Sequence, residues 1–209
     1  MRWGSYKMRF IRPIRWIVSL WNNSIIPVKL EMVKAGNVTH GHRFLSSGEA
    51  IISEAADYEN HLKKLFVIVD FEKRRESIVS QVKKLEKEKK IVVELDENLL
   101  SEVTNLVEWP TVILGDFGKE FLELPFEVLV TTMAVNQRYF PVFQKNKNQS
   151  FKSNKILPHF VTVRNGNKKN VGIVRRGNAK VLKARLSDAR FFYKEDQNKT
   201  LEEFCQMGR

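Results

Sequence analysis

RRGNAKVLKARLSDARFFYKED, residues 175–196, has the spacing of a helix with two different faces. Side chains advance around a helix by about 100° per residue. One arc then carries the apolar residues Leu182, Leu186, Ala189 and Tyr193, and the adjoining arc carries Arg176, Lys180, Lys183, Ser187, Arg190 and Lys194. We therefore predict a helix over residues 179–194 that turns one face to a core and the next to an anion. Gly177 and Asn178 are expected to end the preceding segment and cap this helix.

The basic arc belongs to a wider charge asymmetry. Residues 131–209 hold 17 Lys and Arg against 5 Asp and Glu, whereas residues 1–130 hold 19 of each, so the formal net charge of +12 arises from the last part of the chain. The first thirty residues also lack acid and carry Arg2, Lys7, Arg9, Arg12, Arg15 and Lys29. Regions with such an excess of positive charge are typical of proteins that bind a structured nucleic acid. A basic protein that is merely well solvated is the alternative.

The sequence nominates nine nucleic-acid contacts. They are the basic residues of the predicted helix, its flanks and the strand before it: Arg175, Arg176, Lys180, Lys183, Arg190 and Lys194 first, then Arg164, Lys168 and Lys169. When Lys and Arg side chains contact phosphates, they release condensed counterions, so the affinity for the nucleic acid falls steeply as the salt concentration rises. Reversing Lys183 and Arg190 to Glu is expected to weaken RNA binding more than tenfold. Tyr139, Phe140 and Phe143 are candidates for base stacking, although aromatic residues in a strand usually lie in a core.

Chemistry-bearing residues form no convincing catalytic or metal site. The single cysteine, Cys205, excludes an internal disulfide and a cysteine-cluster zinc site. His40 and His42 have no evident third and fourth ligand, so we interpret them as hydrogen-bonding residues. A hydrolase would need a base or metal-bound water, and its candidates are scattered over several segments: His42, Asp57, Asp70, Glu108 and Asp116. No apolar run is long enough to span a membrane, and the expected location is the cytoplasm.

The order of patterns indicates an α+β fold of mixed or antiparallel strands with packed helices. We expect a hairpin within residues 8–30 that turns at 21–24, helices over 47–64, after Asp70, after Asp96 and over 121–134, and strands at 65–69, 91–93, 138–143 and 158–164. A polar loop over 144–155 separates the last two strands. A subdivision into an α+β region at 1–125 and a basic α+β region at 126–204 is expected.

Several long strings resemble the N-terminal half of the beta subunit of bacterial glycyl-tRNA synthetase. They are RFIRPIRWIV, AGNVTHGHRFL, EVTNLVEWPTVILGDF, FLELPFEVLVTTM, QRYFPVF, FVTVRNGN and RRGNAKVLKARLSDARFFYKED, in that family's order, from residue 2 to about 204. The resemblance implies a piece of an ATP-dependent glycine–tRNA ligase, an alpha2beta2 heterotetramer. In it the alpha subunit carries out aminoacylation with ATP and Mg²⁺, and the beta subunit binds tRNA(Gly).

This sequence itself lacks the class II ATP motifs and a HIGH-like signature, so the fragment is expected to be non-catalytic and to hold no cofactor. A fainter similarity links DENLLSEVTNLVEW, residues 96–109, to the editing-domain region of the phenylalanyl-tRNA synthetase beta subunit. Two alternatives to tRNA binding remain open. One is an assembly module that contacts the alpha subunit or other beta domains, and the other is an editing-like hydrolase.

Overall fold

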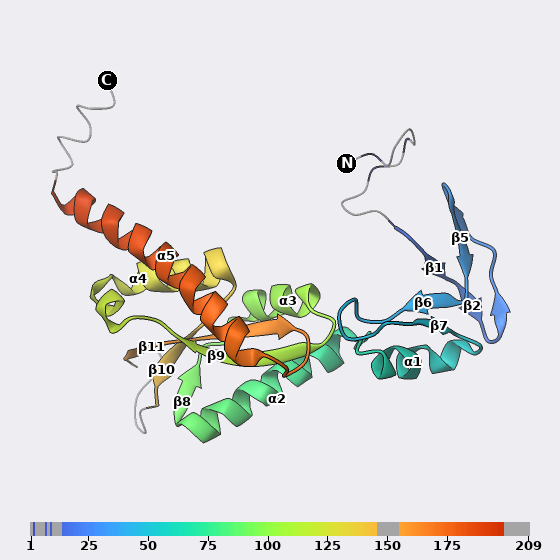
Figure 1. The fold of residues 1–209 in the computed structure, drawn as a ribbon, viewed down its shortest axis with the longest axis horizontal. Helices are drawn as coiled ribbons and strands as arrows, with labels where there is room; N and C mark the ends of the chain where they lie inside the picture. The colour runs from blue at the N-terminus through green and yellow to red at the C-terminus, as the bar shows by residue number, and fades with distance from the viewer. Residues whose placement is uncertain (1, 3–6, 8, 10–13, 146–154, 199–209) are drawn as a thin grey trace. The chain divides into compact units, whose positions relative to one another are not determined.

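Figure 1 shows the computed structural model, which describes residues 2, 7, 9, 14–145 and 155–198. The chain divides into two compact units, Met1–Arg74 and Arg75–Arg209. The subdivision expected at residue 125 falls between strands that belong to one sheet of the second unit, as described below. Most of the polar loop expected at 144–155, and Cys205, lie outside the described residues.

The first unit contains short strands and one short helix. Its elements are β1 (Ile17–Val18), β2 (Leu20–Trp21), β3 (Ser24–Ile25), β4 (Lys29–Leu30), β5 (Val33–Gly36), β6 (Val38–His40), β7 (Glu49–Ile51), η1 (Ala55–Asp57) and α1 (Tyr58–Lys64). β1 pairs parallel with β5, which pairs antiparallel with β4. β2 and β3 form the expected hairpin, and Asn22 adopts the left-handed conformation in its turn (φ 52°).

The prediction of a helix over residues 47–64 is wrong for the first half of that range. β7 pairs antiparallel with β6, and Ala50 and Ile52 are buried on one side of it. Their alternation therefore has the period of a strand, and only residues 58–64 are α-helical. The strand expected at 65–69 is also absent from this described segment. Leu65 instead closes α1 through its backbone N–H, and Phe66 is left-handed (φ 61°).

The second unit is built on a four-stranded antiparallel sheet. Its strands are β8 (Ile91–Val93), β9 (Pro110–Asp116), β10 (Phe140–Gln144) and β11 (Ile156–Asn165), in the spatial order β8-β10-β11-β9. β11 and β9 pair over seven positions, from His159 opposite Asp116 to Asn165 opposite Pro110. The predicted α+β fold class is confirmed.

Helices cover both faces of this sheet. On one face α2 (Phe71–Lys89) and α3 (Glu97–Leu106) bury Ile78, Val82 and Leu100 against Phe140 and Val161. On the other face lie η2 (Lys119–Glu123), α4 (Phe126–Val130), the π-helical turn η3 (Thr131–Asn136) and the long α5 (Val171–Gln197). In Figure 1 α5 runs diagonally across the sheet. No helix in the described part of the chain is both long and apolar enough to cross a membrane.

Two of the predicted helix starts are confirmed in detail. The Asp70 carboxylate accepts a hydrogen bond from the backbone N–H of Lys73 at 2.8 Å, and Asp96 accepts one from Leu99 at the same distance. Each satisfies a backbone donor that the first turn of a helix leaves unpaired. The helix expected over 121–134 is divided at Pro125, which stands between η2 and α4.

Side chains of α2 close both edges of the sheet. At β9, Gln81 accepts a hydrogen bond from the N–H of Val112 and donates one to the carbonyl of Pro110. At β8, Glu86 accepts from the N–H of Val93 at 2.8 Å. Three backbone groups of the edge strands are therefore bonded within the unit and not left open for another chain.

Candidate nucleic-acid interface

α5 is fixed on the sheet by the apolar arc that its sequence predicts. Leu182 and Leu186 are completely buried, in a cluster with Phe121, Met133 and Phe160. Ala179 and Tyr193 pack at the margins of this cluster. The helix starts at Val171, eight residues before the expected start, and Gly177 and Asn178 lie inside it. A helical glycine costs about 1 kcal/mol relative to alanine, and the packing on its C-terminal side outweighs that cost.

Arg176, Lys180 and Lys183 form an exposed row on the arc beside the buried leucines. We call these three residues the basic face of α5. They span about 10 Å along the helix axis. Among the described residues none of the three has an ion-pair partner. This face therefore presents three uncompensated cations on a helix whose position is set by its core contacts.

Glu123 neutralises part of the charge near the other end of the helix. Its Oε1 atom lies 2.6 Å from Nε of Arg190 and 3.7 Å from Nζ of Lys194. The two cations tie α5 to η2, although all three side chains keep some exposure. Reversing Arg190 would place two carboxylates together, so Arg190 is unsuited to a clean test of RNA binding. Sequence spacing could not reveal this partner, because Glu123 is distant in the chain.

Arg175 is exposed but lies on a different face from the basic face. It precedes Leu182 by about two turns, so both side chains leave the helix on nearly the same side. The buried cluster beneath α5 begins only at Ala179, so Arg175, one turn earlier, is exposed to solvent. It is not part of the row formed by Arg176, Lys180 and Lys183.

The turn before α5 is held by hydrogen bonds to the segment before β9. The Asn165 side chain accepts from the N–H groups of Glu108 and Trp109 at 3.0 Å, and the Gly166 N–H donates to the Trp109 carbonyl. Gly166 has a φ of 151°, which favours glycine. The turn therefore enters α5 in a fixed direction.

Within this turn the three predicted contacts differ. Arg164 is half-buried and donates through Nη1 to the Lys169 carbonyl at 2.6 Å, so it supports the turn. Lys168 and Lys169 are exposed. They extend the basic surface beyond the start of α5.

The three candidate stacking aromatics lie in the core. Tyr139 is 6% exposed, Phe140 is fully buried and Phe143 is 2% exposed. The rings of Tyr139 and Phe160 stack with centroids 4.7 Å apart. Burial raises the pKa of the Tyr139 phenol, because the charged phenolate would lose its hydration. These residues stabilise the fold and are not available to bases.

The candidates for hydrolytic chemistry lie on separate elements. Asp70 caps α2, Asp57 ends η1, and Asp116 ends β9 in the other unit. His42 is buried, and its Nδ1 accepts from the N–H of Phe44 at 3.2 Å, as expected of a hydrogen-bonding residue. In the described ranges, no three His, Cys, Asp or Glu side chains are placed to hold a metal ion.

Comparison with known proteins gives one consistent result. The family model for the glycyl-tRNA synthetase beta subunit matches residues 1–207. Proteins named glycine–tRNA ligase beta subunit are 51% identical in Listeria welshimeri, 50% in Bacillus subtilis and 44% in Natranaerobius thermophilus, each over 97% of this chain. The chain spans 28–29% of the length of these relatives.

Proposed function

Because the chain belongs to the glycyl-tRNA synthetase beta subunit family, we propose that it supports glycyl-tRNA synthesis by binding the tRNA(Gly) backbone on the basic face of α5. The observation that carries this proposal is the row of Arg176, Lys180 and Lys183, exposed and without ion pairs among the described residues. Their helix is anchored by Leu182 and Leu186. A fixed row of cations suits phosphates, which also have fixed spacing.

The chemistry of the reaction belongs, in this proposal, to the alpha subunit. That subunit would hold ATP and Mg²⁺ and carry out aminoacylation within a cytoplasmic alpha2beta2 enzyme. The present chain contributes positioning, because Asp70 and Asp96 are engaged in helix caps and His42 in a local hydrogen bond. Backbone contacts fix the orientation of a nucleic acid and carry no sequence information by themselves. Identity of the tRNA is therefore read elsewhere.

Salt dependence tests the proposal directly. Replacing both Lys180 and Lys183 with Gln is expected to reduce the slope of log affinity against log salt by roughly 1.4–1.8, because each lost phosphate contact removes about 0.7–0.9. The matched control is Lys87→Gln/Arg185→Gln, which removes two exposed cations outside the basic face. Fluorescence anisotropy of labelled tRNA(Gly) at several salt concentrations measures the slopes for the unmodified chain, the variant and the control. Equal slopes for all three proteins would contradict RNA contact on this face.

A second candidate function, assembly with the alpha subunit, is favoured by apolar side chains elsewhere on α5. Phe191 and Phe192 are 60% and 63% exposed, and their rings meet edge to face with centroids 5.5 Å apart. Val181, also exposed, lies three turns before Phe192 on a similar side of the helix. Large exposed aromatics are enriched at protein interfaces.

Pull-down separates the two candidates. The double variant Phe191→Ala/Phe192→Ala is expected to reduce capture of the alpha subunit at least fivefold if these rings are interface anchors, and to leave tRNA affinity unchanged. The Lys180→Gln/Lys183→Gln variant should show the reverse pattern. Undiminished capture by the Phe variant would reject the assembly role for this surface.

A further inference from the structure

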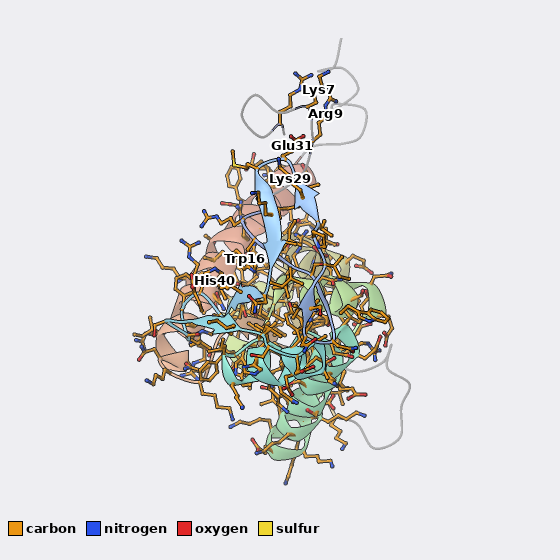
Figure 2. All side chains as sticks on the ribbon, turned by 90° about the vertical axis from the view of Figure 1, so that its right-hand side faces the viewer. Lys7, Arg9, Trp16, Lys29, Glu31 and His40 are labelled. Atoms are coloured by element: carbon orange, nitrogen blue, oxygen red, sulfur yellow. The ribbon has the colours of Figure 1, made fainter. Side chains whose placement is uncertain are left out.

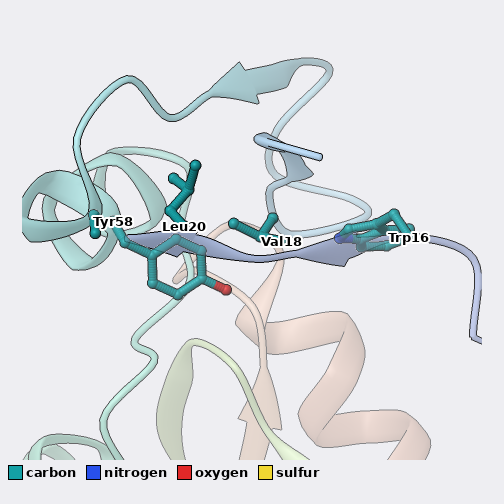
Figure 3. Close-up of a pocket in the computed structure, with 5 residues that line it drawn as sticks. Trp16, Val18, Leu20 and Tyr58 are labelled. Carbon is teal, nitrogen blue, oxygen red and sulfur yellow. The ribbon is translucent and has the colours of Figure 1, made fainter. Parts of the chain in front are cut away.

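A pocket of about 400 Å³ opens in the first unit, remote in sequence from the basic face of α5. Trp16, Val18 and Leu20 form one wall, and Ala55 and Tyr58 from η1 and α1 form another (Figure 3). Alternate residues of an extended chain point the same way, which brings the three wall residues to one side. The volume is within the range of small-ligand pockets, about 300–1,000 Å³.

The Trp16 ring is held in place without a ligand. Its indole N–H donates to Oγ1 of Thr39 at 3.3 Å, and Thr39 is only 3% exposed. The ring also meets His40 edge-on with centroids 4.4 Å apart, and the two residues lie together in Figure 2. Trp16 nevertheless remains 44% exposed. The pocket thus offers a fixed aromatic surface whose polar edge is already satisfied.

Tyr58 adds a second ring and a polar group. It is half-buried, and within the described part of the chain its hydroxyl has no hydrogen-bond partner. A phenol can donate and accept. Two aromatic rings, aliphatic sides and one hydroxyl match a flat heterocycle with a hydrogen-bonding edge. An aliphatic side chain would leave the hydroxyl unpaired.

Charge around the pocket is uneven. The exposed Arg15 adjoins Trp16 in the chain but does not line the pocket, because successive residues of an extended chain point to opposite sides. Glu54 and Asp57, both exposed, flank Ala55 on the opposite wall. A phosphate is therefore disfavoured beside η1, and the lining residues themselves favour an uncharged flat ring. The ligand that fits is a flat ring with a hydrogen-bonding edge, which is the chemistry of a nucleobase.

We propose that this pocket binds one unpaired nucleobase of RNA, stacked on Trp16 with its hydrogen-bonding edge toward the Tyr58 hydroxyl and its phosphate away from Glu54 and Asp57. The inference rests on the proposed function in that both take RNA as the ligand, but the site and the part of the RNA differ. Single-stranded bases are recognised largely by stacking on aromatic side chains, whichever base is present.

The test uses the 209-residue chain and three hexanucleotide probes: oligoadenylate, oligocytidylate and an abasic hexamer with the same phosphates. Trp16→Ala is expected to weaken binding of the two base-bearing probes by about fivefold or more, the effect of one lost stacked base. Ala55→Phe keeps Trp16 and fills the pocket, so it should give the same loss even if Trp16→Ala is poorly folded. The matched control, Trp21→Ala, removes an exposed tryptophan outside the pocket and should leave binding unchanged.

Two results would overturn the pocket assignment. One is an abasic hexamer that binds as tightly as the base-bearing probes. The other is unchanged affinity in both Trp16→Ala and Ala55→Phe. Failure of the proposed function has a different signature, since Lys180→Gln/Lys183→Gln would then leave tRNA affinity intact. The preference for base-bearing over abasic probes should persist in that double variant.

Discussion

Replacing Leu186 with alanine is expected to lower the free energy of unfolding of the second unit by about 2–5 kcal/mol. Leu186 is fully buried among Phe121, Met133 and Phe160, so truncation removes apolar contacts and leaves a cavity. α5 is attached to its sheet chiefly through Leu182 and Leu186. The variant should therefore also bind tRNA more weakly, because the basic face loses its fixed position.

Urea unfolding followed by circular dichroism measures this effect. Val181→Ala is the matched control, since Val181 neighbours the buried Leu182 but is 47% exposed. Val181→Ala should lower the free energy of unfolding by less than about 1 kcal/mol. If Leu186→Ala costs no more than Val181→Ala, α5 is not anchored as the structure indicates.

Reversing Arg176, Lys180 and Lys183 together to Glu is expected to weaken tRNA(Gly) binding by well over tenfold at low salt. The change replaces the three attractive charges of the basic face with three repulsive ones at the same positions. None of the three has an ion-pair partner among the described residues, so the free energy of unfolding should change little. Filter binding at about 50 mM salt, close to the low-salt limit of typical titrations, measures the loss.

The matched control keeps the same change in net charge at other positions. Lys83→Glu/Lys87→Glu/Arg185→Glu reverses three exposed cations on α2 and on another side of α5. It should retain most of the affinity. Equal losses in both triple variants would mean that tRNA responds to the overall charge of the chain and not to the basic face.

Local signals predicted much of the fold. Asp70 and Asp96 mark helix starts because their carboxylates bond the first turn, and the hairpin turn at Asn22 follows from its tolerance of the left-handed conformation. The first half of the helix expected over 47–64 failed because Ala50, Ile51 and Ala55 have helical spacing, whereas pairing with β6 selected a strand that leaves Ile51 exposed. The start of α5 was misplaced because Gly177 was given more weight than the helix that surrounds it.

The exposed basic row of α5 could be predicted from the sequence, for a physical reason. The periodic row of Arg176, Lys180 and Lys183 depends only on helix geometry, and the structure places all three on one exposed face. The Glu123 ion pairs and the Trp16–Tyr58 pocket depend on tertiary contacts between segments distant in sequence. The alternation of Trp16, Val18 and Leu20 was a readable signal for one wall only.

The single helix α2 hydrogen-bonds both edge strands of the four-stranded sheet, through Gln81 at β9 and Glu86 at β8. Local melting of α2 would thus uncover two strands at once, each with unpaired backbone donors facing outward. Exposed strand margins recruit further chains and seed aggregates. Loosening of α2 at elevated temperature should therefore promote self-association through the exposed strands of the sheet.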